Sequence, residues 1–219
     1  MIFFKRKQGV QAGNAQLMGQ QDRQNDYFAH LPGREKGSYL AVIADGLTKK
    51  AAGKYAAVIS VEILKAGFSD GLYVTQGAEP YFIESFKAIG KRLGDNIYSN
   101  KTGAAVIAVL IWEGYLHYAS AGNCSLYLCH DNGIDLINDP DASQIEIDSF
   151  QIRKKDIVML CSQGASQSLS EMEIFNQLNR KSHPYDKCQG LSELIRQKGW
   201  SNQDNATIII LENMAEGNG

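Results

Sequence analysis

Residues 102–124, TGAAVIAVLIWEGYLHYASAGNC, decide the fold class of this 219-residue chain. Two apolar runs, 104–112 and 115–120, are separated only by Glu113 and Gly114, residues that are typical of turns. So short a connection joins antiparallel strands, because parallel strands need a crossover of about a dozen residues or more. The stretch therefore predicts an antiparallel hairpin of largely buried strands.

The rest of the chain extends this pattern in both directions. An apolar run at 38–44 precedes the hairpin, and further short runs follow at 125–130, 134–137, 157–161 and 207–211. Helix formers fill 51–65, and helices are also expected at about 169–178 and 191–198. Pro80 opens another helix, whose apolar residues recur at three- and four-residue steps: Phe82, Phe86, Ile89, Leu93 and Ile97. Strands and helices in this order predict an α+β layered domain.

Composition limits the partners of the chain. Apolar residues make up 44% of it, which is ordinary for a globular protein and excludes disorder as the default. The 22 basic residues are balanced by 24 acidic ones, so no general attraction to nucleic acid or to an anionic membrane is expected. The longest apolar run, 104–112, is too short to cross a bilayer, which takes about 20 residues.

The start of the chain and its cysteines indicate the compartment. MIFFKRKQG has its apolar residues ahead of the basic ones, the reverse of a secretory signal. The cysteines are too irregularly spaced for a zinc site and too few for a disulfide scaffold. We expect a cytoplasmic protein with reduced thiols at all four positions: Cys124, Cys129, Cys161 and Cys188.

Small polar groups end several of the expected strands. They are Asp45-Gly46, then AGNC at 121–124, CSQG at 161–164, and Asp204-Asn205 ahead of the last strand. Each one alone is adequately explained as a turn, because Asp, Asn and Gly favour turns for backbone reasons. Their order along the chain carries more information than any single one.

In that order the chain resembles the metal-dependent protein phosphatases of the PPM (type 2C) family, in their short bacterial form. The family's G-x-R-x-x-x-E-D segment corresponds to GQQDRQND at 19–26, and its D-G motif to ADGLTKKAAGKYAA at 44–57. The hairpin that leads to G-D-S corresponds to residues 102–124, S-D-G to DIVMLCSQG at 156–164, and D-N-x-T to DNAT at 204–207. The resemblance covers residues 19–211 with all five motifs in order.

This resemblance implies a fold and a chemistry. The fold would be a four-layer α-β-β-α sandwich of two antiparallel sheets flanked by helices. It would form a single domain over 1–219, with a core of about 19–211 and a polar tail at 212–219. Two Mg²⁺ or Mn²⁺ ions between the sheets would activate a water that attacks the phosphorus of phosphoserine or phosphothreonine. An arginine of the first motif would clamp the phosphate.

Carried over residue by residue, the match is uneven. Asp45 corresponds to the aspartate that bridges both metals, Gly46 to a carbonyl ligand, Asp204 to a ligand of one ion, and Asp26 to the second acid of E-D. Elsewhere amides replace functional residues. The clamping arginine falls on Gln21, although Arg23 lies close by as a possible phosphate contact, and three acidic positions of the family are also amides here: Asn25, Asn123 and Gln163.

Two functional hypotheses follow. In the first, the chain is a catalytically impaired pseudophosphatase that binds Mg²⁺ or Mn²⁺ weakly or not at all and recognises a phosphoprotein or a protein kinase. In the second, it is an active but atypical phosphatase. Asp45 and Asp204 would then hold a metal that Asp26, Asn25 or Gln163 completes, with Arg23 as the clamp. An unrelated α+β domain whose turns imitate the motifs remains the third alternative.

Overall fold

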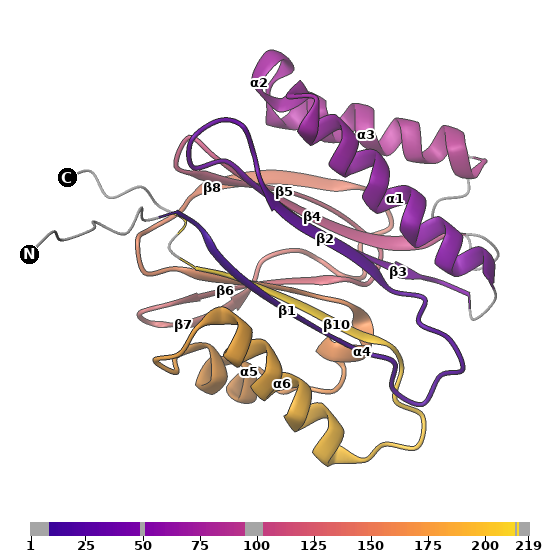
Figure 1. Cartoon of the computed structure of the whole chain (residues 1–219), viewed down its shortest axis with the longest axis vertical. Helices are drawn as coiled ribbons and strands as arrows, with labels where there is room; N and C mark the ends of the chain where they lie inside the picture. Colours follow the sequence, from indigo (N-terminus) through magenta and orange to yellow (C-terminus); the bar gives the residue numbers. More distant parts are fainter. Residues whose placement is uncertain (1–8, 49–50, 95–102, 213, 215–219) are drawn as a thin grey trace, which may run out of the picture.

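The computed structural model describes residues 9–48, 51–94, 103–212 and 214. Within them, two antiparallel five-stranded sheets pack face to face, and helices cover both outer faces (Figure 1). The predicted α+β class and the four-layer α-β-β-α sandwich are confirmed.

The order of the strands in each sheet is simple. One sheet contains, in spatial order, β1 (Gln11–Leu17), β10 (Ala206–Glu212), β9 (Ile157–Cys161), β6 (Ser125–His130) and β7 (Gly133–Leu136). The other contains β2 (Tyr27–Pro32), β3 (Tyr39–Gly46), β4 (Ala104–Trp112), β5 (Tyr115–Ala121) and β8 (Glu146–Gln151). The β4–β5 hairpin pairs Trp112 with Tyr115, as the sequence predicts.

The helices fall into two layers, one on each sheet. The outer face of the β2–β8 sheet is covered by α1 (Ala51–Ser69), α2 (Leu72–Gln76) and α3 (Ala78–Leu93). The β1–β7 sheet carries α4 (Gln163–Ser166), α5 (Glu171–Leu178) and α6 (Pro184–Lys198). Three apolar cores result, one under each helical layer and one between the two sheets.

Local sequence explains where the helices begin and end. Phe82, Phe86 and Ile89 of α3 are buried against the sheet, as their spacing predicts, whereas Ile97 lies outside the described residues. Ser170 and Glu173 form a capping box at the start of α5. Both α3 and α6 are followed by a glycine in the left-handed conformation, which ends them.

Three strands were not predicted: β1, β2 and β8. All three lie at the edges of the sheets, and β2 and β8 expose part of every residue, so neither shows the apolar run that marked the central strands. β1 also precedes Gly19, the first residue of the resemblance. Among the described residues, the sheet thus includes Gln11–Leu17, which precedes the range that the resemblance covers.

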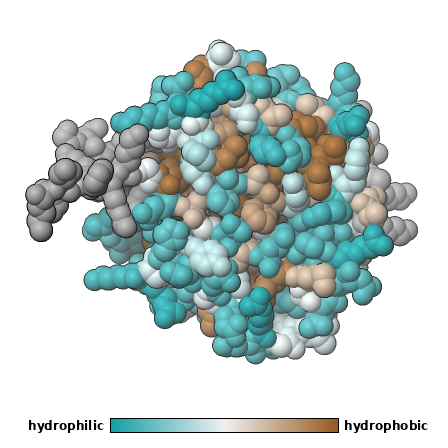
Figure 2. Space-filling view, in the orientation of Figure 1, coloured by the Kyte–Doolittle hydropathy of each residue, from teal (hydrophilic) through white to brown (hydrophobic). Residues whose placement is uncertain are grey.

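The cysteines behave as predicted, since all four are buried free thiols. Burial raises the pKa of the Cys124, Cys161 and Cys188 thiols, which keeps them protonated and unreactive. On the face shown in Figure 2, hydrophobic residues are scattered among hydrophilic ones. None of the described helices combines the length and apolar character that crossing a membrane requires.

Gly13 provides a test of how closely β1 packs on α6. A Cβ atom at this position would lie 2.2 Å from the backbone nitrogen of Tyr185. Gly13→Ala is therefore expected to lower the free energy of unfolding by about 1–3 kcal/mol, because rigid backbone must shift. Gly9→Ala is the control, since nothing lies within 4 Å of its Cβ position. Urea denaturation measures both, and equal stabilities would contradict this packing.

Candidate functional site

The five motifs meet at one end of the sandwich, where they form a cleft of about 230 Å³. Its walls come from the loop before β2, the end of β3, the β5–β6 turn, the start of α4 and the residues before β10. The lining is mainly polar and contains seven of the nine predicted site positions. The lining residues are Gln21, Asn25, Asp45, Gly46, Leu47, Asn123, Gln163, Asp204 and Asn205.

Asp26, the eighth position, is fully buried beside this cleft. Its Oδ2 atom accepts hydrogen bonds from the hydroxyls of Ser162 and Thr207, each at 2.7 Å. The Nζ of Lys54 donates to the backbone carbonyl of Asp26 at 2.6 Å. Asp26 Oδ1 accepts no hydrogen bond from an amide, hydroxyl or ammonium group, and the carboxyl group of Asp45 lies within hydrogen-bond reach of Asp26.

Asp26 and Asp45 form an electrostatically strained pair. Burial raises the pKa of Asp45 well above its ordinary value, and the negative charge of Asp26 raises it further. Burial also raises the pKa of Asp26, although the Thr207 and Ser162 hydroxyls oppose this. Two adjacent carboxylates with so little water around them need a proton or a cation between them.

Unpartnered oxygens gather at the cleft. Among the described residues that are not exposed, three buried side-chain nitrogen or oxygen atoms lack a hydrogen-bond partner, and all three are oxygens: Asn25 Oδ1, Asp26 Oδ1 and Asn123 Oδ1. The Nδ2 of Asn25 donates to the carbonyl of Thr48 at 2.9 Å, which holds the amide so that its oxygen is the free atom. A buried acceptor without a donor costs about 1–3 kcal/mol, so these atoms favour a ligand that donates hydrogen bonds or carries positive charge.

The donor set of the cleft suits a hard divalent cation. Carboxylate, amide and backbone carbonyl oxygens are the ligands that Mg²⁺, Mn²⁺ and Ca²⁺ prefer. In the part of the chain that the structure describes, however, no group of three or more His, Cys, Asp or Glu side chains could hold a metal. A cation in this cleft would therefore depend on the amide and carbonyl oxygens as well as on Asp45 and Asp204.

Asn205 is a site residue that sequence reasoning missed. Its Oδ1 accepts a hydrogen bond from the backbone N–H of Asn25 at 2.7 Å. Its Nδ2 donates to the carbonyls of Met18 and Arg23 at 2.8 and 3.0 Å. This side chain thus fixes the loop that carries Gln21 and Asn25. Its position inside DNAT was the available signal, as it was for Thr207, which anchors Asp26.

The glycines of the motifs are explained by backbone packing. A Cβ at Gly46 would lie 2.5 Å from the backbone of Gly53 in α1, and a Cβ at Gly164 would lie 2.0 Å from the carbonyl oxygen of Asn205. Both positions therefore require glycine for the fold, whatever the chemistry of the cleft. Their presence supports the architecture and says nothing about catalysis.

Arg23, the ninth position, does not line the cleft. Its side chain is exposed, and its backbone carbonyl accepts from Asn205. Gln21, which falls at the position of the family's clamping arginine, does line it. A contact between Arg23 and a bound phosphate stays a prediction.

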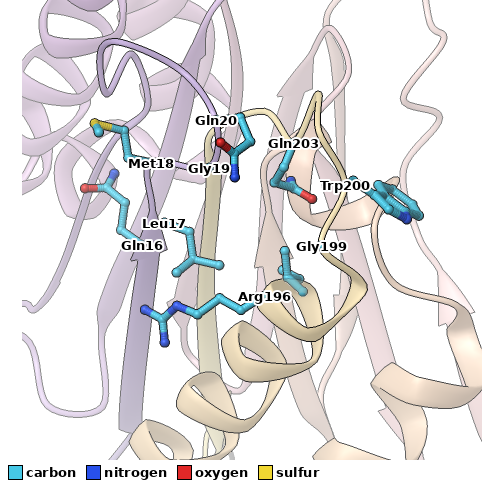
Figure 3. Close-up of a pocket in the computed structure, with 10 residues that line it drawn as sticks. Gln16, Leu17, Met18, Gly19, Gln20, Arg196, Gly199, Trp200 and Gln203 are labelled. Atoms are coloured by element: carbon cyan, nitrogen blue, oxygen red, sulfur yellow. The ribbon is translucent and has the colours of Figure 1, made fainter.

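A second cavity, of about 330 Å³, lies on the other side of the same loops. Leu17 of β1, Arg196 of α6 and Trp200 contribute to its lining, with Gln20 and Gln203 at one end (Figure 3). The backbone N–H of Gln20 donates to the carbonyl of Gln203 at 2.8 Å. Gln203 lines this second cavity, whereas the next residue, Asp204, lines the cleft.

The architecture and the arrangement of the motifs define the class of this chain: it has the fold of the bacterial PPM-type serine/threonine phosphatases. The predicted resemblance is thereby confirmed at the level of the fold. No protein-family model matches the sequence, and no curated protein matches it.

Particular solved structures show the extent of the likeness. The serine/threonine phosphatase of Streptococcus agalactiae (S. agalactiae) superposes with a TM-score of 0.79 at 15% identity, over 93% of this chain and 99% of the other. Stp1 from Staphylococcus aureus gives 0.78 at 18% identity, over 95% and 96%. PstP/Ppp from Mycobacterium tuberculosis gives 0.75 at 18% identity, over 93% and 98%.

Replacement of Asp26 tests the strained carboxyl pair. In Asp26→Asn the amide oxygen can still accept from Ser162 and Thr207, while the amide nitrogen can donate to Asp45. Because the raised pKa values disfavour the ionised pair in the folded state, removing one charge is expected to raise the free energy of unfolding by about 1–3 kcal/mol at pH 7.5 in EDTA.

The size of the effect depends on pH. Because the pKa values of Asp26 and Asp45 are raised in the folded protein, lowering the pH protonates the folded wild type before the unfolded chain, so the gain is expected to shrink toward pH 4. The exposed Asp70→Asn is the control and is expected to change stability by less than about 0.5 kcal/mol. Chemical denaturation at both pH values measures this, and an Asp26→Asn protein less stable than wild type at pH 7.5 would refute the strain.

Proposed function

We propose that this chain is a PPM-type phosphatase-like protein with impaired catalysis, which acts as a cytoplasmic regulatory module by binding a phosphoprotein or a protein kinase. One observation carries the proposal: amides stand at the cleft positions where the resembled family has charged groups. Asp45 and Asp204 keep their carboxylates, but the neutral positions outnumber them: Gln21, Asn25, Asn123 and Gln163.

Charge explains why these replacements impair catalysis. Two divalent ions bring four positive charges, whereas Asp26, Asp45 and Asp204 together offer at most three negative ones. Changes that only touch the surroundings of a metal ligand already cost about 10–100-fold in affinity, and the loss of a charged ligand costs at least as much. Binding of two ions together is therefore expected to be weak at millimolar Mg²⁺ or Mn²⁺.

The residues that would hold a divalent ion are nevertheless identifiable. Asp45, Gly46 and Asn25 line the cleft together with Asp204 and Gln163, and the amide oxygen of Asn25 has no hydrogen-bond partner. A bound ion would supply an acidified water and neutralise phosphoryl charge. Without it, the amides of Gln21 and Gln163 can still donate hydrogen bonds to a phosphate, which allows recognition without hydrolysis.

An active, atypical phosphatase is the second candidate. It is favoured by the free oxygens of Asn25, Asp26 and Asn123, which a cation would satisfy. In that case Asp45 and Asp204 would hold the ion, and the amides would complete its shell. The two candidates differ in whether the protein hydrolyses a bound phosphopeptide when Mn²⁺ is present.

Turnover and binding separate these candidates. With Mn²⁺ and a phosphothreonine peptide, the proposal expects wild-type turnover no greater than that of Asp45→Ala. It also expects the peptide to bind more tightly than its unphosphorylated form, as measured by fluorescence anisotropy. Clear two-site Mn²⁺ binding with turnover that Asp45→Ala abolishes would establish the active enzyme instead.

Restoring the missing acids tests whether the cleft lacks only charge. The double substitution Asn25→Glu with Gln163→Asp is expected to raise Mn²⁺ affinity by at least about 100-fold in calorimetry, since it returns two carboxylates to the lining. Asn202→Asp is the control, because Asn202 is exposed and outside the lining. An unchanged affinity in the double variant would show that the cleft geometry itself excludes the metal.

A further inference from the structure

We infer that the second cavity, between β1 and the end of α6, is a docking site for an acidic segment of a partner protein. The segment places an apolar side chain against Leu17 and Ile195 and a neighbouring carboxylate on Arg196. This docking site goes beyond the proposed function, because in the described part of the chain its lining shares no residue with that of the cleft. It also gives a bound partner a way to act on the cleft from outside.

The floor of the second cavity is apolar and fixed. Leu17 is 9% exposed and Ile195 is 2% exposed, and both belong to the core under α5 and α6. The space of about 330 Å³ is at the lower end of the range for ligand pockets, about 300–1,000 Å³, so it suits one or two side chains. A ligand that enters it does not have to open the core.

Large apolar side chains are exposed at the rim of this cavity. Met18 is 52% exposed and Trp200 is 43% exposed, and they lie on opposite sides of it (Figure 3). Trp, Met and Arg are enriched where proteins bind one another, and aromatic and arginine anchors supply much of the binding energy. Because Arg196 lines the same cavity, the residue types typical of an interface are gathered in one place.

Arg196 determines the charge of the ligand. Among the described residues that line the cavity, it is the only charged one. Its side chain extends from α6 toward Leu17 of β1, so the guanidinium lies on the β1 side of the cavity (Figure 3). The ion pair of Arg196 with Glu193, at 3.6 Å, joins two side chains that are more than half exposed and holds the guanidinium only weakly. A carboxylate of the ligand can therefore replace Glu193 and accept two hydrogen bonds from the planar guanidinium.

Lys198, at the edge of the cavity, does not compete for that carboxylate. Its Nζ forms an ion pair with Glu173 of α5 at 2.7 Å, and it lies 6.0 Å from the centre of the Trp200 ring. Its charge is therefore balanced within the protein. The acidic group of the ligand is directed to Arg196, and the apolar group to the floor beside it.

Hydrogen bonds connect Gln16, which lines the second cavity, to the base of the cleft. Its Nε2 donates to Thr207 Oγ1 at 3.1 Å, and the same hydroxyl donates to Asp26 Oδ2 at 2.7 Å. The Nε2 of Gln16 also donates to the backbone carbonyl of Asp26 at 3.3 Å. Gln16 is thus bonded to Asp26 and borders the second cavity at the same time.

Two more lining residues are bonded to the loops that carry the cleft. The carbonyl of Met18 accepts from Asn205 Nδ2 at 2.8 Å, and Asn205 Oδ1 accepts from the backbone N–H of Asn25 at 2.7 Å. The Nε2 of Gln203 donates to the carbonyl of Gly164 in α4 at 3.0 Å. A partner that orders Met18 and Gln203 therefore acts on the residues that position the cleft, without entering it.

Titration of the full chain with short blocked peptides, followed by amide NMR, tests the class of ligand. Gly-Asp-Leu-Asp-Gly is expected to bind in the millimolar range and to shift the Gly199 amide and the Trp200 indole N–H. Three matched peptides, with Asn or Lys in place of both Asp residues or Ala in place of Leu, are each expected to bind at least about fivefold more weakly. No binding of the first peptide, or equal affinity for any of the other three, would overturn the inference.

Substitutions place the peptide on the second cavity. Arg196→Gln and Trp200→Ala are each expected to weaken binding of Gly-Asp-Leu-Asp-Gly at least about fivefold. Arg92→Gln is the matched control for the first, because Arg92 is also exposed in the last turn of a helix, in the other helical layer. Tyr185→Ala is the control for the second, because Tyr185 is an exposed aromatic residue of α6 outside the lining.

All four substituted side chains are exposed, so the variants are expected to fold. Unchanged affinity in Arg196→Gln, or equal losses in the controls, would show that the peptide does not dock at this cavity.

The same titration tests the connection to the cleft. At saturation with Gly-Asp-Leu-Asp-Gly, the backbone amide signals of Asn25 and Asn205 are expected to shift, although neither residue lines the second cavity. Unshifted signals would contradict the connection. No metal ion and no phosphopeptide is present, so turnover with Mn²⁺ would contradict the proposed function alone, and indifference to the acidic peptide would contradict the docking site alone.

Discussion

The buried carboxyl group of Asp26 joins the two sheets at the base of the cleft, and the rest of the site depends on this contact. Asp26 lies directly before β2 in one sheet, whereas its partners Ser162 and Thr207 lie at the end of β9 and on β10 in the other. The Ser162 hydroxyl also accepts from the backbone N–H of Thr207 at 3.0 Å. One oxygen of Asp26 therefore serves the fold, while the carboxyl group as a whole lies within hydrogen-bond reach of Asp45.

The determinants of the fold and those of the chemistry are different atoms of the same motifs. Gly46 and Gly164 are required because neighbouring backbone approaches within 2.5 Å of the Cβ position. The Ser162 and Thr207 hydroxyls are required by Asp26. None of these constraints needs a charge in the cleft, so the acids around it can become amides while the sandwich stays intact. Preserved motifs in this fold are consequently weak evidence for catalysis.

The sequence predicted the central strands well because their apolar runs are buried on both faces. Ala104–Trp112 and Ser125–His130 match the expected limits fully. The edge strands lack that signal, since β2 and β8 are partly exposed along their whole length. In the site, the motifs located Asp45, Asn25 and Asn123 in one cleft. The tertiary bonds of Asn205 and the free oxygens were not predictable, because they depend on loops that meet only after folding.

Replacing acids with amides also changes what the protein needs in order to remain folded. A cleft with carboxylates at Asn25, Asn123 and Gln163, beside Asp26, Asp45 and Asp204, would concentrate negative charge where water is scarce, and only bound cations would offset the repulsion. Amides keep the polar surface and the oxygen donors without that repulsion. The remaining strain lies at the Asp26–Asp45 pair, and the negative charge of Asp204 adds to it. The amides therefore remove the charge that catalysis would use. They also remove the repulsion that only a bound pair of metal ions would offset.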